Sequence, residues 1–122
     1  MSPTAKQQLS MALQVLLGEQ LSSVEFVQDY LQLHSDGPTV TLFVWPIVEF
    51  AGREVHFGDA TYRDELCKRI SRKISEVAVA IEKSIVFSFE DGISLRVSLE
   101  DRAENGYFRR SAYPATTPLF DF

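Results

Sequence analysis

The chain of 122 residues contains one cysteine, Cys67, and two histidines, His34 and His56. A single cysteine excludes an intramolecular disulfide and a zinc site built from several cysteines. Two histidines without the i, i+4 helical spacing give no recognisable metal motif, so we predict no metal and no cofactor. No glycine-rich phosphate loop and no Gly-x-Ser-x-Gly motif is present. We therefore predict that the protein is not an enzyme and has no catalytic residues.

Long apolar runs and an excess of positive charge are also missing. No stretch approaches the roughly 18 consecutive apolar residues of a membrane-spanning helix, and residues 1–6 do not resemble a signal peptide. We expect a cytoplasmic protein that does not bind membranes. The net charge of −5 argues against nucleic-acid binding. An acidic surface suits a basic protein partner, although it also suits solubility alone.

Hydrophobic residues make up 45% of the chain and include nine Phe, four Tyr and one Trp. This apolar content is enough for an ordered core, and the length fits a single domain over residues 1–122. The pattern predicts two helices. The inward face of the first, which begins near Ser2-Pro3, holds Ala5, Leu9, Ala12, Leu13 and Leu16, and that of the second, which begins near Thr61, holds Tyr62, Leu66 and Ile70.

Alternating apolar residues predict strands between and after the helices. Three strands follow the first helix, with turns at Gln28-Asp29 and Asp36-Gly37, and a further hairpin turns at 51–53. Three more strands follow the second helix, with turns at Glu82-Lys83 and Asp91-Gly92. We expect the tail, residues 101–122, to be only partly ordered.

The two halves of the chain look alike over approximately 4–45 and 61–99. Each half reads as a helix, two strands with a polar turn, an Asp-Gly turn and a last alternating strand, with Leu21-Ser22 matching Ile74-Ser75. Two such units can cover each other's sheets, which one unit alone cannot do. The alternative is chance likeness, because Asp-Gly turns are common in β-meanders.

This pattern predicts an α+β fold. An antiparallel sheet, strongly curved or in two layers, would be built from the two helix-plus-β-meander repeats and packed by the two helices. Met11, Val15 and Leu17 lie off the inward face of the first helix, so a homodimer is the expected assembly.

The segments Leu17-Gly18 to Val24 and Ile74-Ser75 to Val77, each leading to an Asp-Gly turn, resemble small uncharacterised bacterial two-repeat β proteins. Some of those proteins are similar to immunity proteins of toxin loci. The resemblance covers about residues 17–99, rests on turn and core residues, and transfers no catalytic residue. It implies a non-catalytic protein-binding domain that inhibits a basic toxin. The alternative is a small-ligand-binding protein or enzyme with a pocket between the two repeats, using His34, His56 and Tyr62.

Aromatic and arginine side chains are enriched at the most energetic positions of protein interfaces. We therefore expect a protein partner to contact residues in two places, the region after the third strand and the tail. The predicted partner-binding residues are Trp45, Tyr107, Phe108, Arg109 and Arg110. The basic run Lys68-Arg69 and Arg72-Lys73 is interpreted as helix C-terminal cations, with phosphate binding as the alternative. Cys67 is expected to be a buried or half-buried thiol.

Overall fold

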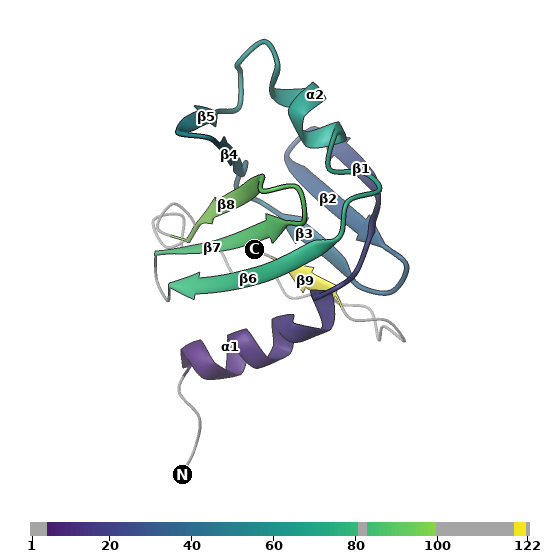
Figure 1. The fold of residues 1–122 in the computed structure, drawn as a ribbon, viewed down its shortest axis with the longest axis vertical. Helices are drawn as coiled ribbons and strands as arrows, with labels where there is room; N and C mark the ends of the chain where they lie inside the picture. The colour runs from purple at the N-terminus through teal and green to yellow at the C-terminus, as the bar shows by residue number, and fades with distance from the viewer. Residues whose placement is uncertain (1–4, 81–82, 100–118, 122) are drawn as a thin grey trace.

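The computed structural model describes residues 5–80, 83–99 and 119–121 (Figure 1). Two helices and nine strands are found in these ranges. In chain order they are α1 (Ala5–Leu13), a 3-10 turn (Gln14–Leu16), β1 (Leu21–Val27), β2 (Tyr30–Ser35), β3 (Thr39–Leu42), β4 (Ile47–Phe50), β5 (Arg53–Val55), α2 (Tyr62–Cys67), β6 (Ile74–Ala80), β7 (Ser84–Phe89), β8 (Ser94–Ser98) and β9 (Leu119–Asp121).

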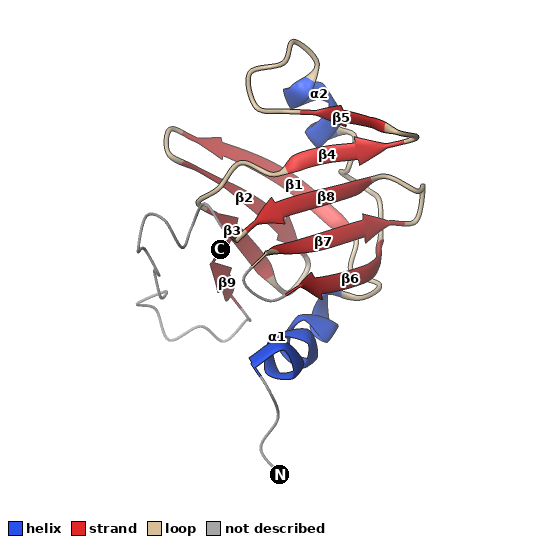
Figure 2. Cartoon of the chain, turned by 90° about the vertical axis from the view of Figure 1, so that its left-hand side faces the viewer, coloured by secondary structure: helices blue, strands red, loops and turns tan. Residues whose placement is uncertain are grey.

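The strands form two sheets that lie in two layers (Figures 1 and 2). The first sheet has the order β1-β2-β3-β9 and the second has the order β5-β4-β8-β7-β6. The helices lie at opposite ends of the molecule, α1 against β6 and α2 near β1 and β4. The described elements are thus mostly antiparallel sheets with few helices, which agrees with the predicted α+β class.

The core lies between the two layers, where β2, β3, β7 and β8 bury apolar side chains. Along β7 and β8 every second side chain is buried, as the alternating sequence predicts. Leu31, Leu33, Val40 and Leu42 cover the inner face of the first sheet, and Ile85, Phe87, Leu95 and Val97 cover that of the second.

The first helix is shorter than its apolar pattern predicts. It ends at Leu13 and continues as a 3-10 turn, after which Gly18 adopts a positive φ of 81°. Leu13 and Leu16 are buried, whereas Ala12 is exposed, so its predicted inward orientation is wrong. The 3-10 turn aligns residues three apart, and this places Leu16 in line with Leu13 and away from the side of Ala12.

Each β-meander begins with an irregular pairing in its first strand. The pairing of β1 with β2 shifts between Leu21 and Ser23, and the pairing of β6 with β7 shifts between Ile74 and Glu76. At these shifts the Ser22 hydroxyl donates to the His34 carbonyl at 3.0 Å, and the Ser75 hydroxyl donates to the Ser88 carbonyl at 3.2 Å. Both serines therefore satisfy a carbonyl at the same position of their respective strand pairs.

The segments that precede β1 and β6 bind each other and join the two sheets. Gly18 N donates to Ile74 O at 2.8 Å, and Ser71 N donates to Leu21 O at 2.7 Å. Two further backbone bonds, each 3.0 Å long, run from Leu21 N to Arg72 O and from Ile74 N to Glu19 O. Ser71 has a positive φ of 74°, close to that of Gly18, although a non-glycine residue disfavours this conformation.

The second helix has six residues, and the residue buried after it is not the predicted one. Ile70 is exposed, because the helix ends at Cys67 and the chain no longer follows the helical spacing. Arg69 is buried instead, with 1% of its surface exposed. Its Nη1 donates to Asp91 Oδ1 at 2.7 Å, and its guanidinium lies 5.3 Å from the centre of the Phe89 ring.

Strand β9 is the part of the tail that the structure describes. It pairs parallel with β3, with Thr39 opposite Leu119 and Val40 opposite Phe120. This is the one parallel pairing among the described strands. It makes the predicted all-antiparallel arrangement wrong at this edge.

Candidate partner-binding surface

Trp45 lies in the connection from β3 to β4, just before Pro46. Its ring stacks on the ring of Phe57, with centroids 4.5 Å apart and planes inclined by 10°. Phe57 follows β5 and is 57% exposed, whereas Trp45 is partly buried. Two residues from different connections thus form one aromatic patch at the protein surface. We call the Trp45–Phe57 pair the aromatic shelf.

Tyr62, the first residue of α2, supports the shelf from inside. Its ring meets Phe57 edge-on at 5.9 Å, and its hydroxyl donates to the carbonyl of Pro46. Burial raises the pKa of the Tyr62 hydroxyl well above its usual range, so this donor stays protonated. The hydrogen bond therefore ties the β3–β4 connection, which carries Trp45, to α2.

The hairpin of β4 and β5 lies next in the chain. Its two-residue turn has positive φ at both Ala51 and Gly52, the conformation that matches the twist of the strands. Glu49 lies directly opposite Glu54 in the register, and like charges in this position repel each other. Arg96 of β8 donates to both carboxylates and offsets this repulsion.

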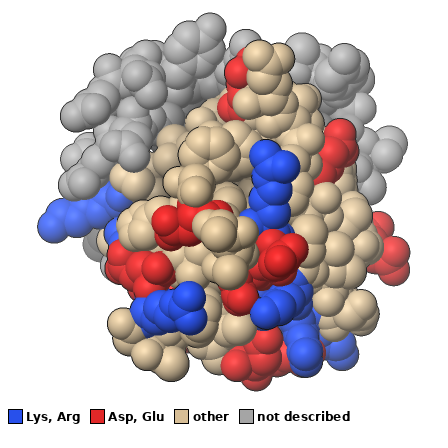
Figure 3. All heavy atoms as spheres, turned by 90° about the horizontal axis from the view of Figure 1, so that it is seen from above, with Lys and Arg blue, Asp and Glu red and all other residues tan. Residues whose placement is uncertain are grey.

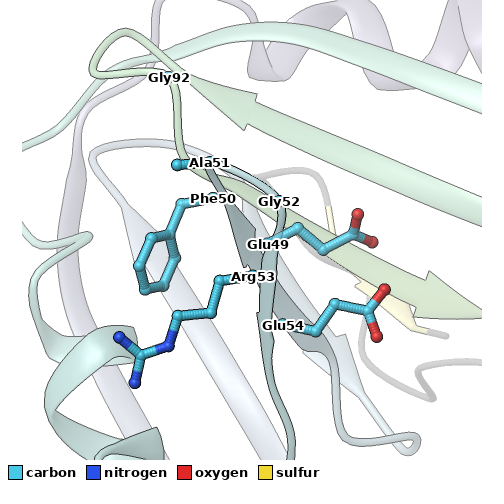
Figure 4. A pocket seen from close by; sticks show the side chains of 7 residues that line it. All are labelled: Glu49, Phe50, Ala51, Gly52, Arg53, Glu54 and Gly92. Atoms are coloured by element: carbon cyan, nitrogen blue, oxygen red, sulfur yellow. The ribbon is translucent and has the colours of Figure 1, made fainter.

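A hollow of about 410 Å³ lies at this hairpin (Figure 4). The side chains of Phe50 and Arg53 point to one side of the hairpin, and those of Glu49 and Glu54 point to the other. The Arg53 guanidinium lies 5.6 Å from the centre of the Phe50 ring. The remaining lining residues are Ala51, Gly52 and Gly92. Neither histidine lines this hollow, and it lies on the hairpin and not at the predicted place between the two repeats.

The carboxylates of the hollow act as partners of Arg96. The hydrogen bond that Arg96 donates to Glu49 raises the pKa of Arg96, and both glutamates lie near the same guanidinium. General acid–base chemistry requires two groups whose surroundings drive their pKa values apart. Arg96 instead provides a shared counter-ion, so this geometry favours a structural salt-bridge cluster.

The two histidines are engaged with different partners. His34 of β2 lies 3.2 Å from Glu25 and 3.3 Å from Thr39. His56 lies 3.0 Å from Glu54, just after β5. Residues 5–80, 83–99 and 119–121 contain no group of three or more His, Cys, Asp and Glu side chains that could hold a metal ion.

Two further predictions concern the second helix. Cys67 is exposed, so its predicted burial is wrong. The buried face of α2 is formed by Tyr62 and Leu66, and Cys67, the residue after Leu66, points away from that face. Within the basic run, Arg69 is buried against Asp91 and Lys68 forms an ion pair with Glu65 at 2.9 Å. These two cations have protein partners, and neither requires a phosphate.

Of the predicted partner-binding residues, the structure places Trp45 in the aromatic shelf. Tyr107, Phe108, Arg109 and Arg110 lie outside the described residues. Phe57, the other residue of the aromatic shelf, is not among the predicted partner-binding residues. The available signal was an aromatic residue directly before Gly58, where a strand stops and its last side chain has no regular neighbour.

The net negative charge of the chain comes from its first half, where lysine and arginine are scarce. Residues 7–52 contain no Lys or Arg, although they include Glu19, Glu25, Asp29, Asp36 and Glu49. Glu19, Asp29 and Asp36 form no salt bridge with any residue that the structure describes. Viewed from the end that carries α2, acidic and basic side chains are interspersed (Figure 3). The first sheet and its turns thus carry Glu25, Asp29 and Asp36 and no lysine or arginine among the described residues.

No helix in the described ranges is both long enough and apolar enough to cross a membrane. The sequence matches no family model, and no curated protein or solved structure is significantly similar to it. The function is therefore argued from the geometry described above.

Proposed function

We propose that this chain is a non-catalytic protein-binding domain of the immunity type, which inhibits a basic toxin. The observation that carries the proposal is the aromatic shelf, because Phe57 is 57% exposed while stacked on Trp45. Exposed large aromatic side chains are typical anchors of protein interfaces. A ring already held by stacking also loses less conformational freedom when a partner covers it.

The basic character of the partner follows from charge. The first sheet contributes carboxylates without any lysine or arginine, and the chain as a whole carries a charge of −5. Complementary charge speeds the encounter with a basic protein and disfavours acidic ones. Blocking a toxin requires only tight coverage of its surface, so this function needs no catalytic group on the inhibitor.

An affinity capture with matched variants tests the proposal. The tagged wild-type chain, Phe57→Ala and Met11→Ala would be used as baits for lysates of cells that contain the source gene cluster. Met11 is the control because it is exposed and apolar, yet it lies on α1 at the opposite end of the molecule from α2. We expect wild type and Met11→Ala to retain one basic protein that Phe57→Ala loses.

The captured protein would then be purified and titrated calorimetrically against each bait. A loss of affinity of about tenfold or more for Phe57→Ala, with an unchanged urea midpoint, would support the shelf as the contact. Growth protection on co-expression would support the inhibitor role. Equal binding by wild type and Phe57→Ala would contradict the assigned surface, and a captured partner that is acidic would contradict the charge argument.

The fold itself is proposed to derive from a duplicated unit of one helix and three strands. The support comes from matching positions 53 residues apart, namely the shifted pairings after Leu21 and Ile74 and the positive φ of Gly18 and Ser71. The four backbone bonds that join the sheets also form two pairs related by this offset. A single unit would leave the inner face of its sheet uncovered, which gives a physical reason for two.

We propose the homodimer separately from the toxin-binding function. Met11 and Val15 are 66% and 48% exposed, and a second copy that covered them would remove apolar surface from water. Sedimentation equilibrium of wild type and Val15→Glu tests it. We expect a concentration-dependent dimer that the glutamate dissociates, and a monomer for both proteins would contradict it.

A further inference from the structure

We propose that the outer edge of β3 is a strand-accepting site for an extended, basic segment of the protein partner, and that β9 occupies this site when no partner is bound. The inference rests on the proposed protein-binding function and specifies how the partner binds. Main-chain hydrogen bonds at a sheet edge give affinity, and alternate side chains give specificity.

The corresponding edge of the second sheet already accepts a strand. There, β4 pairs antiparallel with β8, and Val48 lies opposite Leu95. In the first sheet, β9 pairs parallel with β3, and Phe120 lies opposite Val40. Val40 and Leu95 occupy matching places, because each pairs on its other side with the middle strand of its meander, at Leu33 and Phe87 respectively.

The occupant of the first edge is the weaker of the two. β9 consists of three residues in parallel pairing, whereas β4 pairs antiparallel with β8 and also with β5. Parallel pairs are slightly less stable per residue than antiparallel ones. A partner strand that paired antiparallel along all of Thr39–Leu42 would gain one more residue and the more stable geometry. Such a strand can therefore displace β9.

The chemistry of the partner strand follows from its neighbours. In the register of the first sheet, Glu25 pairs with Gln32, Gln32 with Thr41, and Thr41 with Asp121. β9 thus places an acidic residue at the edge of a sheet that already has carboxylates and no lysine or arginine. A lysine or arginine in the place of Asp121 would put a positive residue in a sheet whose own strands and turns carry only negative ones, and complementary charge favours such a partner. The edge therefore favours a basic strand over its own tail.

The edge also leads directly to the aromatic shelf. Trp45 comes three residues after Leu42, the end of β3. A partner segment that runs along β3 is thus directed toward the connection that carries the shelf. Backbone pairing would hold the segment in place, and contact with the exposed ring of Phe57 would add side-chain recognition.

Two labelled peptides test this inference without knowledge of the natural partner. One has the sequence of residues 117–122, and the other has lysine in the place of Asp121. They would be titrated by fluorescence anisotropy into wild type and into the full-length double variant Leu119→Pro, Phe120→Pro. Successive backbone N–H groups of a strand point to opposite sides, so two consecutive prolines remove whichever donor faces β3.

We expect the double variant to bind both peptides, and the wild type to bind each about tenfold more weakly because β9 competes, a factor that corresponds to about 1.4 kcal/mol. The lysine peptide should bind more tightly than the native one, and added salt should reduce the difference. As a second readout, the lysine peptide in excess should change the hydrogen exchange of the amides of residues 39–42 in the wild type. This measurement does not depend on whether the variant folds.

Absence of peptide binding by both proteins, or equal binding by both, would overturn the inference. A wild-type dimer that the two prolines dissociate would also overturn it, because β9 would then serve a second copy of the chain. The proposed function can be judged separately. If Phe57→Ala loses the captured partner while the peptides fail, the domain still binds protein and only the strand-addition mode is wrong.

Discussion

Replacing Asp91 by asparagine should destabilise the protein by about 3 kcal/mol, because Arg69 would lose its counter-ion. Arg69 is 1% exposed, its Nε has no hydrogen-bond partner, and its Nη1 lies 2.7 Å from Asp91 Oδ1. Removing one partner of a buried ion pair costs roughly 3–5 kcal/mol. The Asp91 side chain is 23% exposed and water can partly replace it, so the lower end of that range applies.

The measurement is urea unfolding at pH 7, followed by circular dichroism and by the fluorescence of the single tryptophan, Trp45. The midpoint should fall while the slope with denaturant stays the same, since the exposed surface does not change. The hydrogen bond from Arg69 lowers the pKa of Asp91. The stabilisation is therefore present above the unfolded-state pKa of about 3.9 and disappears as the pH falls through the folded-state value. The difference between wild type and Asp91→Asn should shrink accordingly.

A second substitution separates the loss of charge pairing from a general defect in the turn. Arg69 corresponds in the proposed duplication to Leu16, which is buried in the first unit. The double variant Arg69→Leu, Asp91→Asn replaces the ion pair with an apolar side chain and should recover most of the lost stability, to within about 1 kcal/mol of wild type. If Asp91→Asn is as stable as wild type at pH 7, or if the double variant is no more stable than the single one, the buried-charge explanation is refuted.

Three further changes test separate features in the same unfolding assay. Ser71→Gly should raise stability by about 0.5 kcal/mol, because it relieves a positive φ of 74°; a lower urea midpoint would contradict this. Tyr62→Phe should cost about 1 kcal/mol, since it leaves a buried carbonyl without its donor, and in the wild type the raised pKa should keep Tyr62 protonated beyond pH 10 in an ultraviolet titration. Arg96→Ala should cost about 1 kcal/mol, because Glu49 and Glu54 lie opposite each other and would lose the cation that they share; an unchanged urea midpoint would contradict the role assigned to Arg96.

The parts of the fold that sequence predicted well are those with strict alternation and strong turn residues. The alternating pattern of Ile85, Phe87 and Phe89 places these side chains in the core, and the Asp91-Gly92 turn follows as expected. Both signals are local, because they depend on the side-chain period of a strand and on turn geometry. The two meanders could therefore be predicted from neighbouring residues alone.

The second helix illustrates why other parts could not be predicted. A helical spacing from Tyr62 implies that Ile70 faces the core, but the helix ends at Cys67. Arg69 then takes the buried place because Asp91, 22 residues later, supplies its partner. A buried arginine is stable only with such a partner, and the pairing depends on tertiary structure that periodicity does not encode.

The candidate site could be predicted only in part, because it too depends on contacts between residues that are distant in the sequence. Trp45 was selected by residue type, whereas Phe57 became a candidate only when the structure stacked the two rings. The parallel pairing of Leu119 with Thr39 is likewise a contact between residues 80 positions apart, and no local pattern announces it. The segments outside the repeats could be identified from the sequence. The contacts among their described residues required the structure.

These segments share one structural role in the fold. In the proposed duplication, the last strand of each unit, β3 or β8, has no partner from its own unit along its outer edge. Exposed strand edges promote unwanted association. The β4–β5 hairpin covers the edge of β8 with Arg96 bound to both Glu49 and Glu54, so it is held by side chains as well as by backbone. β9 covers the edge of β3 with three residues. One edge is thus closed firmly and the other weakly. The weakly closed edge belongs to the cation-free sheet and leads to Trp45, which makes it the part of the molecule best suited to exchange its own strand for that of a partner.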